Sequence, residues 1–168
     1  MNPHAYLFSD GSSARKADIG AYAAIAATPV NRKLIYGIEY PTTISRCELL
    51  PIVAGLRWIN TNWAKGGGFR VTVFSDSEFT VRTLCGDYDR RKHMDLWAGL
   101  DEAAKGMKVT YIWRERNSLP YMDMCDAVCS SLRKAVHADA ERMFGESLSP
   151  EKGMPFGTLP DGTTLEDG

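Results

Sequence analysis

Two aspartates follow the same pair of residues in distant parts of the chain. Asp10 ends the segment Phe8-Ser9-Asp10, and Asp76 ends the segment Phe74-Ser75-Asp76. Each segment closes an apolar run of the kind that forms a strand. If the two strands are parallel neighbours, both carboxylates lie at the same edge of the sheet, where α/β proteins usually bind their ligands.

Two further acids lie near the starts of expected helices. Glu48 follows Ser45 by three residues, and Asp126 lies in the first turns of the last helix. Carboxylates gathered at one edge raise one another's pKa, and a divalent cation relieves their repulsion. A ligand set made only of oxygens favours Mg²⁺ or Mn²⁺ over Zn²⁺. Two such ions can activate a water molecule and stabilise the leaving oxygen of a phosphodiester.

Each acid also has a purely structural explanation. Asp10 could be a turn residue that caps its own loop. Glu48 completes the capping box S-x-x-E with Ser45, and Pro51 is tolerated best if the helix starts close to Glu48. The chemical and the structural explanations of Glu48 do not exclude each other.

The remaining two acids are equally ambiguous. Ser75 and Glu78 form a second S-x-x-E motif around Asp76. Asp126 could simply be an acid that interacts favourably with the helix dipole. Asp123, one turn earlier, competes with Asp126 for any role in a site.

Hydrophobic spacing predicts the elements that carry these acids. The expected strands cover residues 5–10, 19–27, 32–40, 69–75 and 107–113, and the expected helices cover 45–63, 77–84, 94–105 and 121–144. Residues 11–16 are typical of a hairpin loop. Three strands in succession predict an antiparallel meander, and the later strand–helix–strand crossovers add parallel strands. The expected fold is α/β, a five-stranded mixed sheet with helices on both faces.

Composition limits the classes of protein to consider. The chain has 168 residues, of which 44% are hydrophobic, so we expect one compact domain over residues 1–145 and a flexible tail over 146–168. The net charge is −1, so contacts with nucleic acid must rest on local basic patches. The four cysteines form no C-x-x-C pair, and neither a signal peptide nor a membrane span is evident. We therefore expect a cytoplasmic monomer with reduced thiols.

In six short motifs the sequence resembles the type 1 ribonuclease H family. The motifs keep the family's order and spacing across roughly residues 5–135, and they are Phe8-Ser9-Asp10-Gly11-Ser12, Gly20-Ala21-Tyr22-Ala23, Thr42-Thr43 with Arg46-Cys47-Glu48-Leu49, Val73-Phe74-Ser75-Asp76-Ser77, Asp95-Leu96-Trp97 and Cys125-Asp126. The resemblance implies a β-β-β-α-β-α-β-α fold and an endonuclease that cuts the RNA strand of RNA–DNA hybrids. It also implies two Mg²⁺ or Mn²⁺ ions, held by the catalytic carboxylates Asp10, Glu48, Asp76 and Asp126.

The resemblance also indicates which residues contact the substrate. Thr43 matches a position that binds a phosphate of the DNA strand. The expected substrate-binding set, which includes backbone donors at the rim of the sheet, is Gly11, Ser12, Thr43, Ser45, Glu78 and Arg116.

The sequence departs from the family pattern where substrate is expected to bind. The loop before Asp126 has no histidine, and Arg116 occupies that place, while His93 and His137 lie elsewhere. Ile44 and Ser45 stand where asparagines are common, and Glu78 stands where a glutamine is common. The first hairpin carries Arg15-Lys16 in place of a Gly/Pro-rich turn, and the basic protrusion is reduced to residues 90–92.

These departures leave three functions open. The first is a ribonuclease H that acts on hybrids, which the four acids favour. The second is a nuclease of the same fold with another nucleic-acid substrate, which Ile44 and Glu78 favour. The third is a catalytically silent binding module, which the missing histidine favours. Trp97 lies beside Leu96 and Leu100, so core packing is a better interpretation than a stacking platform.

Overall fold

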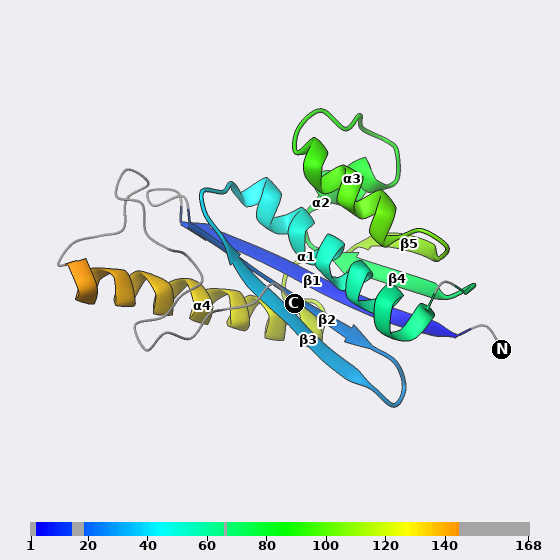
Figure 1. Ribbon diagram of the computed structural model, residues 1–168, viewed down its shortest axis with the longest axis horizontal. Helices are drawn as coiled ribbons and strands as arrows, with labels where there is room; N and C mark the ends of the chain where they lie inside the picture. Colours follow the sequence, from blue (N-terminus) through cyan, green and yellow to red (C-terminus); the bar gives the residue numbers. More distant parts are fainter. Residues whose placement is uncertain (1–2, 15–18, 66, 145–168) are drawn as a thin grey trace.

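The computed structural model describes residues 3–14, 19–65 and 67–144 (Figure 1). The tail expected over 146–168 and the Arg15-Lys16 pair lie outside the described residues. The strands are β1 (His4–Ala14), β2 (Ile19–Ala27), β3 (Arg32–Glu39), β4 (Arg70–Ser75) and β5 (Lys108–Trp113). The helices are α1 (Ile44–Ile59), the π-helical turn η1 (Asn60–Ala64), α2 (Glu78–Leu84), α3 (Met94–Ala103) and α4 (Pro120–Phe144).

The five strands form one mixed sheet in the order β3-β2-β1-β4-β5. β1, β2 and β3 pair antiparallel, whereas β4 pairs parallel to both β1 and β5. The α/β fold expected from the sequence is therefore confirmed, including the parallel pairing of the two strands that carry Phe-Ser-Asp.

Helices cover both faces of this sheet because the strands alternate their side chains between the faces. Tyr22, Ala24 and Ala26 of β2 belong to the main core, with the apolar sides of α1 and α3. Ala21, Ala23 and Ile25 of β2 point the other way and pack with Cys125 and Cys129 of α4. Figure 1 shows α4 on the side of the sheet away from α1 and α3.

The first hairpin differs from the expectation. β1 does not end at Asp10 but continues to Ala14, and Gly11 and Ser12 pair with Tyr22 and Ala21 of β2. The prediction of a loop from residue 11 was wrong for residues 11–14, because small residues there extend the ladder with β2. None of the helices in the described part of the chain is long and apolar enough to cross a membrane.

Candidate active site

Asp10 and Asp76 lie at the point where two parallel strands separate. The last paired residues of β1 and β4 are Phe8 and Phe74, two positions before each acid. Beyond that pair β1 continues with β2 alone, and β4 ends at Ser75. Both carboxylates therefore follow the carboxyl end of the parallel ladder, which is the usual place for a site in an α/β sheet.

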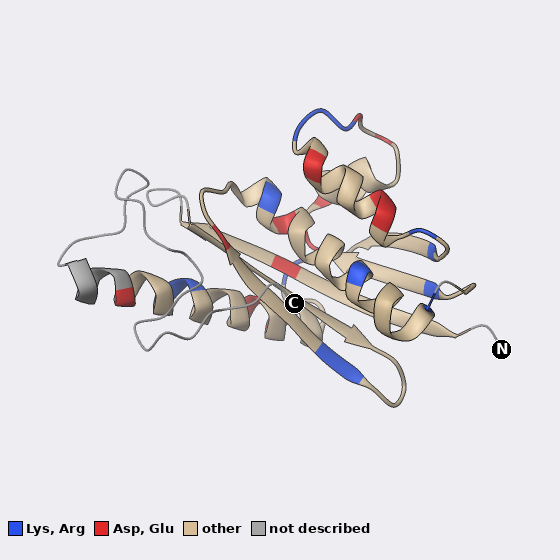
Figure 2. Ribbon diagram, viewed as in Figure 1, with Lys and Arg blue, Asp and Glu red and all other residues tan. Residues whose placement is uncertain are grey.

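A glycine brings Glu48 to the same place. A Cβ atom on Gly11 would lie 2.1 Å from the carbonyl oxygen of Cys47 and 2.9 Å from the backbone nitrogen of Glu48. Only a residue without a side chain lets the first turns of α1 approach β1 this closely. Figure 2 shows an acidic segment of β1 beside an acidic segment of α1 in the middle of the molecule.

Neither capping box forms. The N-cap of α1 is Thr43, whose hydroxyl accepts a hydrogen bond from the backbone nitrogen of Arg46 at 3.4 Å. The N-cap of α2 is Ser77, whose hydroxyl accepts from the backbone nitrogen of Thr80 at 3.3 Å. The capping explanations of Glu48 and Asp76 were therefore wrong, and α1 begins at Ile44, one residue before the expected Ser45 and four before Glu48.

Asp126 faces the site from α4, and Arg116 accompanies it. The Nη2 atom of Arg116 lies 3.2 Å from the Oδ1 atom of Asp126, and the Asp126 side chain is about one third exposed. Asp123 is exposed, and it is Asp126 whose carboxyl group influences Asp10. The thiol of Cys129 donates to the backbone oxygen of Asp10 at 3.4 Å and holds this part of α4 against β1.

Burial and neighbouring acids raise the pKa values of Asp10, Glu48 and Asp76. Burial, followed by the charge of Asp76 and the carboxyl group of Asp126, raises the pKa of Asp10 from 3.8 to about 8. Burial and the charge of Asp76 also raise the pKa of Glu48, against a hydrogen bond from Ser77 that lowers it. Burial raises the pKa of Asp76, whereas the charge of Arg116 lowers it. The four acids thus form one electrostatically coupled group.

The chemistry of this group fits a divalent cation, although its side chains do not yet enclose one. Buried carboxylates that raise one another's pKa are stabilised by a hard cation with oxygen ligands. Within residues 3–14, 19–65 and 67–144, however, no three acidic, histidine or cysteine side chains converge closely enough to hold an ion. In this arrangement Asp126 is paired with Arg116.

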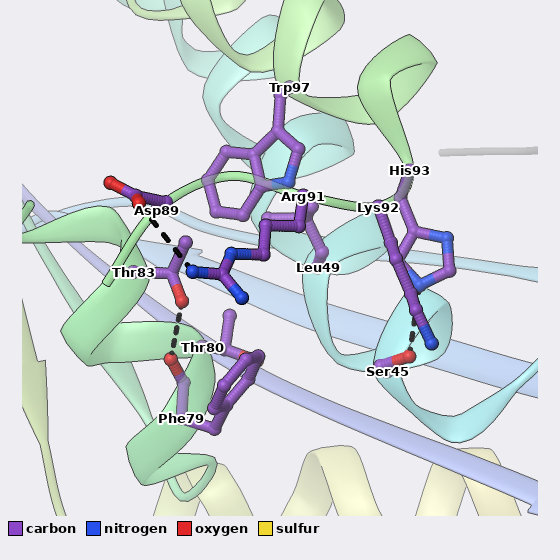
Figure 3. A pocket seen from close by; sticks show the side chains of 10 residues that line it. All are labelled: Ser45, Leu49, Phe79, Thr80, Thr83, Asp89, Arg91, Lys92, His93 and Trp97. Atoms are coloured by element: carbon purple, nitrogen blue, oxygen red, sulfur yellow. Dashed lines mark hydrogen bonds and ion pairs between the residues drawn. The ribbon is translucent and has the colours of Figure 1, made fainter.

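A cavity of about 280 Å³ opens between α1, α2, α3 and the loop before α3 (Figure 3). Its lining residues are Ser45, Leu49, Phe79, Thr80, Thr83, Asp89, Arg91, Lys92, His93 and Trp97. Figure 3 shows the Arg91 side chain extending into the cavity below Trp97. Trp97 is 6% exposed and belongs to the main core, so its interpretation as a core residue is confirmed.

The expected substrate-binding residues fall into four places. Thr43 and Ser45 lie at the start of α1, where their hydroxyl groups are 3.1 Å apart. Glu78 is exposed on α2 and forms an ion pair with Arg82 at 2.9 Å. Gly11 and Ser12 lie within β1, and Arg116 lies between β5 and α4.

Sequence reasoning passed over His93. Its Nε2 atom lies 3.0 Å from the hydroxyl of Ser45, and it caps α3 with a left-handed backbone at φ 60°. Burial and the charge of Arg46 lower its pKa. The one signal in the sequence was its position directly before Met94-Asp95-Leu96-Trp97.

The basic loop of residues 90–92 is only partly available to a ligand. Arg90 is bound to Asp101 at 2.8 Å and lies over the ring of Trp97, 4.6 Å from its centroid. Arg91 lies 3.8 Å from Asp89, and both side chains are more than four-fifths exposed. Arg90 therefore supports the fold, while Arg91 and Lys92 face the cavity.

A β3-β2-β1-β4-β5 sheet with acids at the end of its parallel ladder defines a ribonuclease H-like protein. No protein-family model matches the sequence. The chain is 26% identical over 138 residues to the ribonuclease H of Cupriavidus metallidurans, covering 74% of this chain and 91% of that protein. It is 29% identical over 141 residues to the ribonuclease H of a Sulfurovum species, covering 79% and 92%. For the ribonuclease HI of Helicobacter pylori the identity is 28% over 131 residues, covering 73% and 87%.

Solved structures agree with these relatives. The N-terminal RNase H domain of rv2228c from Mycobacterium tuberculosis superposes with a TM-score of 0.67 at 18% identity, covering 83% of this chain and 99% of that chain. LC11-RNase H1, solved in complex with an RNA/DNA hybrid, superposes with a TM-score of 0.63 at 15% identity, covering 76% and 94%. The chain is thus similar in sequence to ribonucleases H over most of its length and has the ribonuclease H-like fold.

Proposed function

We propose that this protein is a divalent-metal-dependent endonuclease that hydrolyses the RNA strand of RNA–DNA hybrids. The observation that carries the proposal is that Asp10, Glu48 and Asp76 lie with Asp126 at the end of the β1–β4 ladder, where burial and neighbouring acids raise the pKa values of the first three. The names of the curated relatives, and the hybrid bound to one similar structure, support it.

Asp10, Glu48, Asp76 and Asp126 would hold two Mg²⁺ or Mn²⁺ ions. When bound, such ions supply Lewis-acid activation of the scissile phosphate and lower the pKa of the attacking water. Asp10 provides the most buried carboxylate, and the Gly11 backbone N–H stabilises its ionised form. Because this N–H interacts with the carboxylate of Asp10, we assign Gly11 a role in positioning the acids of the site. The products would carry 5′-phosphate and 3′-hydroxyl ends.

Arg116 takes the place where the family often has a histidine. An arginine stays charged at any physiological pH and cannot carry a proton between groups. Its charge lowers the pKa of Asp76, and its guanidinium group pairs with Asp126. We assign Arg116 two roles: its charge opposes the rise in the pKa of Asp76, and its exposed guanidinium group would contact a phosphate of the RNA strand.

The rim beside Glu48 would hold the DNA strand. Thr43 and Ser45 present hydroxyl groups there, and Ser12 lies in the strand next to Gly11. His93 joins them through Ser45, and Arg91 and Lys92 add positive charge from the neighbouring loop. Hydroxyl groups and cations at one rim suit a phosphate backbone, to which most contacts with nucleic acid are made.

The decisive experiment compares wild type with Asp10→Asn on labelled duplexes. The duplexes are an RNA–DNA hybrid, RNA–RNA, DNA–DNA and a DNA duplex with one embedded ribonucleotide, each with Mg²⁺, Mn²⁺ or EDTA. We expect cleavage of the RNA strand of the hybrid, lost in EDTA and in Asp10→Asn and retained in the control Asp123→Asn. An intact hybrid with both metals would contradict the proposal.

A second candidate is the same chemistry on another nucleic acid. The observation in its favour is Glu78, which places an exposed negative charge on α2 two residues after Asp76. Faster cleavage of double-stranded RNA or of the embedded ribonucleotide than of the hybrid would establish this candidate. In both cases we propose that residues 1–145 act as one monomeric, cytoplasmic domain.

A further inference from the structure

On one face of the sheet, the side chains of β1, β4 and β5 change in type along the strands. The strand register aligns His4 with Arg70 and Lys108 in a first row. Tyr6, Thr72 and Thr110 form the second row, and Phe8, Phe74 and Ile112 form the third. Asp10 and Asp76 follow two residues beyond Phe8 and Phe74, where the pairing of β1 with β4 has ended. The face therefore runs from cations, through aromatic rings, to the candidate active site.

The aromatic rings of this face are stacked in a continuous line. The His4 and Tyr6 ring centroids are 4.7 Å apart, those of Tyr6 and Phe74 are 6.3 Å apart, and those of Phe74 and Phe8 are 5.2 Å apart. Neighbouring rings are nearly parallel, with interplanar angles of 15–29°. Tyr6 is 41% exposed although it lies within β1. A large aromatic side chain exposed on a sheet is a candidate contact for a ligand.

Helix α4 covers only part of this face. It packs on β1, β2 and β3. The centroid of its Tyr121 ring lies 5.1 Å from that of Phe8, at one end of the line of rings. Tyr6 is exposed beyond that contact, as are Arg70, Lys108 and Thr110. We call His4, Tyr6, Phe74, Arg70 and Lys108 the sheet platform.

Positively charged side chains lie at both ends of the line of rings. Arg70 and Lys108 are exposed and adjacent across β4 and β5, and Figure 2 shows basic segments where these strands begin. At the other end the guanidinium group of Arg114 lies over the Phe74 ring, 5.7 Å from its centroid. Rings for bases and cations for phosphates are the two parts of a surface that binds single-stranded nucleic acid.

We propose that the sheet platform binds a single-stranded stretch of nucleic acid that continues from a duplex bound at the active site. Charge complementarity and continuity with the acids support this occupant, since Tyr6 lies about 13 Å along β1 from Asp10 at about 3.3 Å per residue. The identity of the polymer rests on the proposed function. The platform itself needs no cleavage to act, because stacking and phosphate contacts are binding interactions.

The test measures binding in EDTA with the full-length chain, so that cleavage plays no part. Fluorescence anisotropy compares a blunt RNA–DNA hybrid with the same hybrid carrying a single-stranded extension at either end of the RNA. We expect one extension to tighten binding about tenfold through stacking and phosphate contacts. Tyr6→Ala should abolish this gain, whereas Tyr6→Phe should keep it. Leu34→Ala, which removes a side chain of 40% exposure on β3, should also keep it.

The charged residues provide an independent variant, should Tyr6→Ala fail to fold. Replacing Arg70 and Lys108 with glutamine changes only exposed side chains. Each lost phosphate contact should reduce the salt dependence of binding to the extended hybrid by about 0.7 in log–log slope, with no change for the blunt hybrid. Lys105→Gln changes a residue whose backbone oxygen accepts a hydrogen bond from Asn60, at the end of α1, and should leave the slope unchanged. No gain from either extension, or a gain and slope that survive these substitutions, would overturn the proposal. If the wild-type protein binds the extended hybrid more tightly but leaves the hybrid uncut with Mg²⁺ and Mn²⁺, only the proposed function is refuted.

Discussion

Replacing Asp10 with asparagine should stabilise the metal-free protein while it abolishes cleavage. The reason is that Asp10 is 8% exposed and lies beside two other acids. Its ionised form is therefore disfavoured in the folded protein but not in the unfolded chain. Asparagine has nearly the same shape and carries no charge at any pH.

The size of the effect follows from the pKa of Asp10. That pKa rises from 3.8 to about 8 on folding. Each unit of difference between the folded and unfolded pKa corresponds to about 1.4 kcal/mol, so the full penalty above pH 8 has a ceiling of about 6 kcal/mol. Local rearrangement and entry of water reduce such penalties, and we expect a gain of about 2 kcal/mol or more at pH 8. For a chain of this size that gain raises the melting temperature by roughly 4–8 °C.

The dependence on pH has a definite sign. An acid whose pKa is raised by folding costs nothing below its unfolded pKa, and its cost grows as the pH rises toward its folded pKa. Without metal, wild type should therefore lose stability between about pH 4 and pH 8. The advantage of Asp10→Asn should be near zero at pH 4 and largest at pH 8.

Thermal melts in EDTA at several pH values measure this difference, with Asp123→Asn as the control for a neutralised but exposed acid. Adding Mg²⁺ should stabilise wild type, because a ligand that binds only the folded state raises its stability. It should stabilise Asp10→Asn much less. If Asp10→Asn melts below wild type at pH 8 in EDTA, the electrostatic reasoning about this site is wrong.

Three further substitutions test other parts of the site. Gly11→Ala would place a Cβ atom 2.1 Å from a backbone oxygen of α1 and should cost about 3 kcal/mol in denaturant melts, whereas Gly67→Ala, whose nearest contact is 3.8 Å, should change little. Glu78→Gln should lower the KM for hybrid about twofold at low salt, with a stability change below about 0.5 kcal/mol, since its ion pair with Arg82 is exposed; an unchanged KM would remove Glu78 from the substrate surface. Arg116→His should have the KM of wild type near pH 5.5 and the KM of Arg116→Ala near pH 8, because histidine loses its charge around pH 6.5. If the ratio of the Arg116→His KM to the wild-type KM is the same at both pH values, this charge has no role in binding.

The fold could be predicted because its signals are local. Apolar runs and turn residues located all five strands, and β2 has the predicted bounds Ile19–Ala27. The repeated Phe-Ser-Asp indicated that the two aspartates lie at the same edge if their strands are parallel neighbours, and the parallel register of Phe8 with Phe74 confirms that pairing. Buried strands and amphipathic helices follow periods of two and 3.6 residues, which a single sequence displays directly.

The capping motifs could not be resolved from the sequence because neighbouring hydroxyl groups compete. Two S-x-x-E motifs begin at Ser45 and Ser75, yet the caps are Thr43 and Ser77. In each case a hydroxyl group two residues away takes the role. Which one does so depends on where the chain leaves the preceding strand, and that is set by tertiary contacts. The hydroxyl group of Ser45 instead forms a hydrogen bond with His93, 48 residues further along the chain.

The close approach at Gly11 was hidden for the same reason. A glycine after an aspartate is typical of a turn, and the first hairpin was expected to begin there. Its actual constraint is the carbonyl oxygen of Cys47, which no local pattern reveals. The position of Glu48 beside Asp10 thus depends on a missing side chain in β1 as much as on any residue of α1.

Arg116 gives the site a different response to metal from that of a site with histidine. A histidine in this loop can lose its charge near neutral pH, whereas arginine cannot. The positive charge of Arg116 therefore remains beside Asp126 whether or not cations are present. It keeps the pKa of Asp76 lower than burial alone would allow, which favours metal binding, yet it also repels an incoming cation. Because its side chain is 70% exposed, Arg116 can turn away from Asp126 toward a phosphate, so substrate and metal would release the same ion pair.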